Sequence, residues 1–301
     1  MNNKKELRRR NRLILLITVL LLLSLVIILS RKSNNNIEHR SQWYLKKLFE
    51  DSELYKQNEK KVKIAIIDSG IYTDHPDLKS IPITEYCVNG VDVANNNDYE
   101  HGTNVCGIIC AYPSSEKGIV GIVNNNCEII SIDISDNSGI VGAEGIVEGF
   151  NYAIESDVDI INISFSTEND YPQIREVVSK ANERGIIIVA SAGNDFNGKA
   201  NYPAAYDEVL SVASYSKNEK IIYSELEDCI YLPGENVVTT SYEDKDAYVS
   251  RTGTSFSAPI LTGMIAKVLS DVDDKKEYSE KLMNISGKIL SYRELKTKII
   301  K

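Results

Sequence analysis

The chain has 301 residues, of which 43% are hydrophobic and 26% charged, with a net charge of −9 at pH 7. This length supplies one substantial core and not clearly two, so one folded domain with a short leading segment is the simplest organisation. Residues 1–40 carry nine Lys/Arg against two Glu, a net +7, and the remaining 261 residues carry 25 Lys/Arg against 41 Asp/Glu, a net −16. A domain this acidic repels nucleic acid and attracts basic peptides, so we expect no nucleic-acid partner.

The first forty residues have the pattern of a membrane anchor. A basic segment, residues 1–12, precedes an uncharged stretch of mainly Leu, Ile and Val at 13–30, long enough to cross the hydrocarbon core as one helix. A cleaved signal peptide is the alternative, but no Ala-x-Ala-like site ends the stretch, which favours an uncleaved transmembrane helix. Six basic residues precede this span, and three follow within the next ten residues. We therefore expect a single-pass protein of the cell membrane with a cytoplasmic N-terminus and an extracytoplasmic domain.

A polar tether, residues 31–40, leads to a domain expected at 41–301. It opens with an amphipathic helix near Trp43, and beyond Lys61 short runs rich in Ile and Val alternate with helical stretches. The predicted strands are 62–67, 128–134, 159–165, 185–191 and 209–214. The predicted helices are 102–111, 145–154, 173–184 and 255–269, the last with Pro259 in its first turn. A capping box at 291 predicts a closing helix that runs to 300. This alternation predicts an α/β fold: a three-layer, doubly wound parallel sheet with its site at the carboxyl ends of the strands.

Three motifs carry the residue types of an activated nucleophile. Asp68 lies in Ile-Ile-Asp-Ser-Gly, His101 opens His-Gly-Thr, and Ser255 lies in Gly-Thr-Ser-Phe-Ser-Ala-Pro. In a triad the Ser attacks, the His accepts its proton, and the Asp holds the His in the correct tautomer. A turn, a surface loop or a helix cap explains each motif alone, but the joint order Asp, His, Ser is not that of α/β-hydrolases or chymotrypsin-like enzymes. His101 is the one candidate base, because His39 lies in the tether and His75 in a turn.

With Asp-His-Pro-Asp-Leu at 74–78 and Ser-Ala-Gly-Asn at 191–194, the chain from about Gln42 onward resembles the subtilase (subtilisin-like, S8-type) serine peptidases. The resemblance implies a subtilisin-like fold and an acyl-enzyme formed on Ser255. It also implies that Asn194 donates a hydrogen bond to the oxyanion, beside the backbone N–H of Ser255.

The resemblance further implies how substrate binds. Subtilases hold the peptide as an added strand between two segments, here 139–141 and 164–166. The implied substrate-binding residues are Gly139, Val141, Ser164, Phe165, Ser166, Gly193 and Asn201. Ser166 and Asn201 replace glycines common in the family, and Asp195 follows Asn194 at the rim of the pocket. This favours a polar or basic substrate side chain before the scissile bond.

Calcium is the only metal ion for which the resemblance suggests ligand positions. Asp77 and Gln42 correspond to ligand positions of a structural calcium site in the family, but residues 112–117 lack the Asn residues that often complete it. An isolated Asp in a surface turn is the simpler interpretation. We therefore expect no required cofactor and assign no metal ligand, with a structural calcium ion as the less favoured alternative.

The sequence thus predicts a membrane-anchored serine endopeptidase acting on extracytoplasmic peptides or proteins. Removal of a leader from an exported peptide precursor suits a tethered enzyme. Residues 31–41 cannot hold the folding propeptide usual in the family, so we expect the domain to fold alone or with a partner supplied in trans. The alternative is a catalytically degenerate subtilase-fold module that binds peptides or regulates a partner at the membrane, which the departures at Asn104, Ser166 and Asn201 allow.

Overall fold

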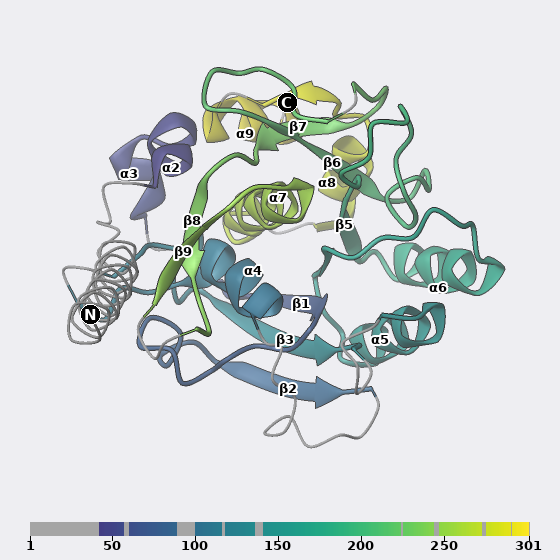
Figure 1. Cartoon of the computed structure of the whole chain (residues 1–301), viewed down its shortest axis with the longest axis horizontal. Coiled ribbons are helices and arrows are strands. Elements are labelled where there is room, and N and C mark those ends of the chain that lie inside the picture. The colour runs from purple at the N-terminus through teal and green to yellow at the C-terminus, as the bar shows by residue number, and fades with distance from the viewer. Residues whose placement is uncertain are drawn as a thin grey trace, which may run out of the picture. The chain divides into compact units, whose positions relative to one another are not determined.

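A computed structural model of the chain describes residues 42–56, 60–88, 100–115, 118–135, 141–223, 225–243, 247–272, 275–289 and 291–300, with side chains from 278 onward in the helix that begins at 275 (Figure 1). The basic segment 1–12, the predicted anchor 13–30 and the tether 31–40 lie outside these residues. None of the helices in the described ranges is both long and apolar enough to span a bilayer.

A parallel β-sheet is the centre of the described domain. Its strand order is β10-β7-β6-β5-β4-β1-β3-β2, and every neighbouring pair is parallel. The strands are β1 (Val62–Asp68), β2 (Ile83–Cys87), β3 (Cys127–Asp133), β4 (Ile160–Ile163), β5 (Ile187–Ser191), β6 (Leu210–Tyr215), β7 (Ile230–Pro233) and β10 (Gly287–Lys288), and a separate antiparallel hairpin joins β8 (Val237–Thr240) to β9 (Tyr248–Arg251). The central strands are buried along nearly their whole length, as expected of a parallel sheet covered on both faces.

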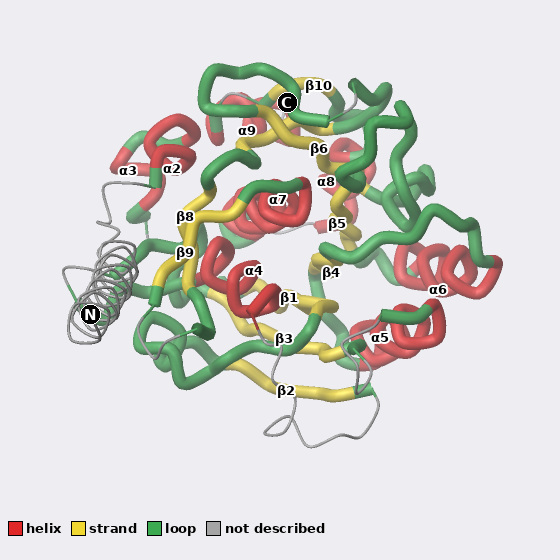
Figure 2. Tube along the Cα trace, viewed as in Figure 1, coloured by secondary structure: helices red, strands yellow, loops and turns green. Residues whose placement is uncertain are grey.

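Helices pack on both faces of this sheet. The helices of the described residues are α2 (Trp43–Leu48), α3 (Asp51–Leu54), α4 (Glu100–Cys110), α5 (Ala143–Glu155), α6 (Pro172–Glu183), α7 (Thr254–Leu269), α8 (Lys275–Leu282) and α9 (Tyr292–Ile300). Figures 1 and 2 show α4 and α7 on one side of the sheet and α5 and α6 on the other. On the α5/α6 side, Ala65 and Ile67 of β1 belong to one apolar cluster with Phe150 of α5 and Val178 of α6. The predicted three-layer α/β architecture is confirmed for the domain.

The five predicted strands and the predicted helices are confirmed with ends shifted by a few residues. Strands β2, β7, β8, β9 and β10 were not predicted, since β2 is a partly exposed edge strand and β10 has only two residues. The last long helix begins at Thr254 and not at Ser255, and the placement of Pro259 in its first turn is wrong. Pro259 is the sixth residue of α7, inside the helix, where its missing N–H leaves the carbonyl of Ser255 without a helical donor.

The segment around α2 is tied to distant parts of the chain. Trp43 Nε1 donates to the carbonyl of Glu235 (2.9 Å), and the Tyr44 hydroxyl donates to that of Val238 (3.3 Å). The buried Lys267 of α7 donates to the carbonyl of Leu54 at the end of α3 (3.0 Å), and burial lowers the pKa of its ammonium to about 8. The folded domain therefore includes the segment that begins at Gln42.

Candidate active site

Asp68 and His101 are joined at the carboxyl end of β1. Asp68 is the last residue of this strand and is fully buried, and its Oδ1 and Oδ2 lie 2.8 and 3.0 Å from His101 Nδ1. The carboxylate also accepts the backbone N–H of Ser69 (2.8 Å). Because an ionised carboxylate only accepts hydrogen bonds, the Nδ1 proton of His101 is donated to it, which makes Nε2 the basic nitrogen of the ring.

A close approach of two backbones makes this pairing possible. A Cβ atom at position 102 would lie 2.0 Å from the carbonyl oxygen of Gly70, so only Gly at 102 lets α4 begin directly against the turn after Asp68. The backbone N–H of Gly102 donates to Ser69 Oγ (3.3 Å), and the N–H of Tyr72 donates to Thr103 Oγ1 (2.8 Å). The Gly of the His-Gly-Thr motif is therefore a packing requirement of the site.

Ser255 lies in the first turn of α7, half-buried, and is paired with the end of β4. Its Oγ donates to the carbonyl of Ser164, and Ser164 Oγ donates to the carbonyl of Ser255, both at 3.1 Å. The second bond uses the carbonyl that Pro259 leaves free. The following residues of both segments flank His101: the ring centroids of Phe165 and Phe256 lie 5.4 and 5.5 Å from that of His101. The tertiary structure thus brings Ser255, Ser164 and His101 together.

Asn194 lies beside the N-terminus of α7, three residues after β5 ends. Its Oδ1 accepts hydrogen bonds from the N–H (2.9 Å) and the hydroxyl (3.0 Å) of Thr254. Because these two donors fix which end of the amide is the oxygen, the Nδ2 group of Asn194 is a hydrogen-bond donor next to the positive end of the helix dipole. Gly253 turns the chain into the helix with a φ of +155°, which favours glycine. The arrangement can stabilise an anion that forms beside Ser255.

The predicted pocket residues form one polar cluster around Asn201. This side chain is nearly buried, and its Nδ2 donates to Asp195 Oδ2 (2.8 Å) and approaches Ser166 Oγ at 3.5 Å. Gly193 has a φ of +98°, and a Cβ atom there would lie 2.7 Å from Asn201 Nδ2. The polar side chains that replace the glycines expected from the resemblance therefore face one another. Nothing in the sequence indicated that Ser166 and Asn201 would form a hydrogen bond.

The other predicted peptide-binding segment is only partly described. Val141 pairs with Ser135 in an isolated antiparallel bridge just beyond the end of β3. Gly139 lies outside the described residues.

The calcium positions suggested by the resemblance do not fit a metal ion. Asp77 is fully buried, and its two oxygens accept hydrogen bonds from the N–H and hydroxyl of Ser114, the N–H of Ile119 and the hydroxyl of Tyr248 (2.8–2.9 Å). Gln42 exchanges two hydrogen bonds with the backbone of Val120. Four protein donors thus occupy the carboxylate that a calcium ion would need. Asp77 is a structural acceptor and not the isolated surface Asp that we expected.

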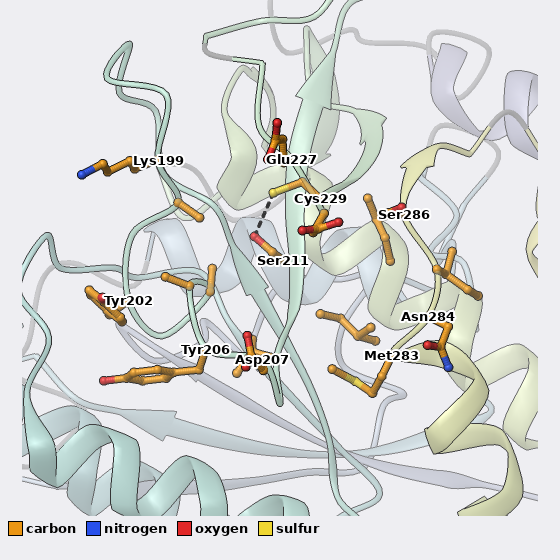
Figure 3. A pocket seen from close by; sticks show the side chains of 18 residues that line it. Lys199, Tyr202, Tyr206, Asp207, Ser211, Glu227, Cys229, Met283, Asn284 and Ser286 are labelled. Atoms are coloured by element: carbon orange, nitrogen blue, oxygen red, sulfur yellow. Dashed lines mark hydrogen bonds between the residues drawn. The ribbon is translucent and has the colours of Figure 1, made fainter.

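Figure 3 shows the side chains that line a cavity of about 690 Å³. Ser211 near the start of β6, Cys229 just before β7 and Met283 after α8 line it, and the thiol of Cys229 donates to Ser211 Oγ (3.1 Å). Asp68, His101, Asn194 and Ser255 do not line it, whereas Lys199, Ala200 and Tyr202, which flank Asn201 in the chain, do. The cavity is therefore not part of the cluster of candidate catalytic residues.

Comparison with known proteins decides the family. The family model for the subtilase family matches residues 59–297. The chain belongs to the subtilase family. It is 35% identical over 225 residues to the major intracellular serine protease of Bacillus subtilis, a match that covers 70% of this chain and 69% of that protein. It is also 35% identical over 211 residues to the minor extracellular protease Epr of Bacillus subtilis, covering 69% of this chain and 32% of Epr.

The protease domain of PatA, solved as a serine-to-alanine mutant, has the same fold. The TM-score is 0.69 at 19% sequence identity, over 81% of this chain and 96% of that domain. This subtilase is a hydrolase of the serine protease type, and a serine protease acts on a peptide or protein substrate.

Proposed function

We propose that this subtilase is an endopeptidase in which Ser255 is the nucleophile, His101 the general base, Asp68 its orienting carboxylate and Asn194 an oxyanion donor. The observation that carries the proposal is the hydrogen bond from the half-buried His101 to the buried Asp68, beside Ser255 at the N-terminus of α7. These groups come from separate segments of the chain, and packing of the sheet and its helices holds them together.

The reaction follows from this arrangement. The Ser255 proton turns from the Ser164 carbonyl to His101 Nε2 as Oγ attacks the substrate carbonyl. The resulting oxyanion is stabilised by Asn194 Nδ2 and by the Ser255 N–H at the start of α7. The imidazolium, stabilised by Asp68, then gives its proton to the leaving amine. Water hydrolyses the acyl-enzyme by the same proton transfers in reverse.

One contact favours the alternative of a module that binds peptides without turnover. The Ser255 hydroxyl donates to the Ser164 carbonyl, so its proton is engaged away from the base. A fluorophosphonate probe separates the two candidates, because it labels only an activated Ser. We expect the folded full-length protein to be labelled once, at Ser255, and Ser255→Ala to remain unlabelled. Ser250→Ala, an exposed Ser on β9, is the matched control and should label normally. A folded wild-type protein that resists the probe would establish the degenerate module.

We also propose that residues 13–30 anchor the enzyme in the cell membrane with the peptidase domain outside. The uncharged span and the excess of basic residues before it support this topology. The similar proteins include both an intracellular and an extracellular protease of Bacillus subtilis, so family membership alone does not assign the compartment.

Protease treatment of intact protoplasts is expected to remove the domain and leave a short membrane-bound fragment. A cytoplasmic protein in the same cells should survive, as the control for intact membranes. If the domain resists treatment until the cells are lysed, the proposed orientation is wrong. If it appears in the medium without residues 1–30, the span is a cleaved signal.

Within this proposal, the substrate is an exported peptide precursor that loses its leader at the membrane. The acidic domain and the cluster of Ser166, Asp195 and Asn201 support a substrate with a polar or basic side chain before the cleaved bond. Comparing the new N-termini produced by cells with wild-type enzyme and with Ser255→Ala identifies it. Termini that do not differ between the two strains would contradict a processing role.

A further inference from the structure

A hydrogen-bonded network surrounds Glu100, the residue directly before His101. Glu100 Oε1 lies 2.7 Å from Arg251 Nη2, and Oε2 accepts the backbone N–H of Tyr242 (2.6 Å). The hydroxyl of Ser241 lies 2.9 and 3.0 Å from the two oxygens. Burial opposes ionisation of Glu100, but the bonds from Tyr242, Asn104, Arg251 and Ser241 prevail and lower its pKa below the usual value. The carboxylate is therefore charged and held from several directions.

Asn104 closes the network one helical turn further along α4. Its Oδ1 accepts Arg251 Nε (3.2 Å), and its Nδ2 donates to the carbonyl of Thr240 (2.7 Å) and to Glu100 Oε1 (3.1 Å). The side chain is 1% exposed, so it has no solvent alternative. The planar guanidinium of Arg251 thus donates hydrogen bonds to two acceptors on the same face of α4, a geometry that a lysine cannot reproduce.

The network connects the two parts of the chain that carry the base and the nucleophile. Glu100 and Asn104 are in the first two turns of α4, which holds His101. Arg251 is the last residue of β9, and only Thr252, Gly253 and Thr254 separate it from Ser255. Thr240 and Ser241, at the end of β8, complete the connection. Any shift of β9 relative to α4 would move Ser255 relative to His101.

We propose that Glu100, Asn104 and Arg251 are positioning residues that set the distance and orientation between His101 and Ser255. The inference rests on the proposed function, because it needs these two residues to be base and nucleophile. None of the three side chains needs to touch substrate for this role. Proton transfer between the two residues depends steeply on their alignment, so loosening the network slows the chemical step more than it weakens substrate binding.

The test measures kcat and KM of the membrane-bound full-length enzyme on one peptide substrate, with concentrations corrected for correctly folded protein. Arg251→Met is expected to lower kcat about tenfold and to change KM less than twofold. Arg251→Lys keeps the charge and should recover part of kcat. Glu100→Gln should lower kcat as well, and the Glu100→Gln/Arg251→Met double variant should lose little more than the worse single variant, because both changes break one interaction.

Arg293→Met is the matched control. Arg293 also pairs with a carboxylate, Glu50 (3.0 Å), but the pair is exposed and joins α9 to the residue before α3, not α4 to β9, so kcat should not change. The inference is overturned if folded Arg251→Met and Glu100→Gln keep wild-type kcat, or if KM alone rises, which would make Arg251 a substrate contact. If Arg251→Met does not fold, Arg251→Lys and Asn104→Ala decide by the same criterion. Failure of the proposed function is distinguishable, because it would appear as activity retained by Ser255→Ala.

Discussion

Replacing Ser255 by Ala is expected to lower kcat/KM for peptide hydrolysis by about 10⁴-fold or more, because the nucleophile and its base act as a unit. His101→Ala should cause a loss of similar size, and the double variant should lose little beyond either single variant. The Ser255 hydroxyl is half-buried and donates to the Ser164 carbonyl, so its removal should leave the thermal unfolding temperature nearly unchanged. Initial rates on a quenched fluorescent peptide library, with melting curves for each variant, measure both effects.

The control for this series is Ser250→Ala, which changes an exposed Ser on β9 and should cleave at the wild-type rate. Activity of Ser255→Ala within tenfold of wild type would rule out Ser255 as the nucleophile. A reduced rate in Ser250→Ala would show instead that the strand before the helix tolerates no change. The difference in hydrolysis rate between Ser255→Ala and Ser250→Ala then decides whether Ser255 is the nucleophile.

Asn194→Ala is expected to reduce kcat by about 10²–10³-fold, the usual effect of removing one oxyanion donor, with a much smaller change in KM. In the proposed role the amide acts only when negative charge develops on the substrate oxygen, so its loss should affect the transition state more than the bound substrate. Asn194→Asp should be at least as damaging. A carboxylate can still accept the two bonds from Thr254, but it supplies no donor and places a negative charge beside the oxyanion.

Steady-state kinetics of both Asn194 variants, with Asn169→Ala as an exposed Asn control, test this assignment. Equal kcat values for wild type and Asn194→Ala would remove Asn194 from the mechanism. If Asn194→Asp were the more active variant, the amide would contribute through its bonds to Thr254 and not through its donor.

The alternation of apolar runs determined much of the fold without reference to tertiary contacts. The strands near 62–67 and 187–191 are short and nearly wholly buried. Each therefore appears in the sequence as a nearly unbroken run of apolar residues, which can be recognised without knowing its partner strands. Strand β2 lies at the sheet edge, where its residues are half-buried or exposed and do not alternate, and its pairing with β3 is what makes it a strand. The antiparallel pairing of β8 with β9 likewise depends on partners and not on a local pattern.

The sequence by itself determined which residue types could do the chemistry, because Asp68, His101, Asn194 and Ser255 each stand in a local motif of characteristic turn and helix-start residues. Only the tertiary structure decided how they are held. The carboxylate of Asp77 is satisfied by donors from distant segments, Ser114 and Tyr248, so it is a structural acceptor. The ring of contacts around Glu100 and Arg251 joins residues 151 positions apart. Such contacts form only after the sheet and its helices pack, because a hydrogen bond between remote residues depends on the relative placement of whole elements and has no periodicity in the sequence.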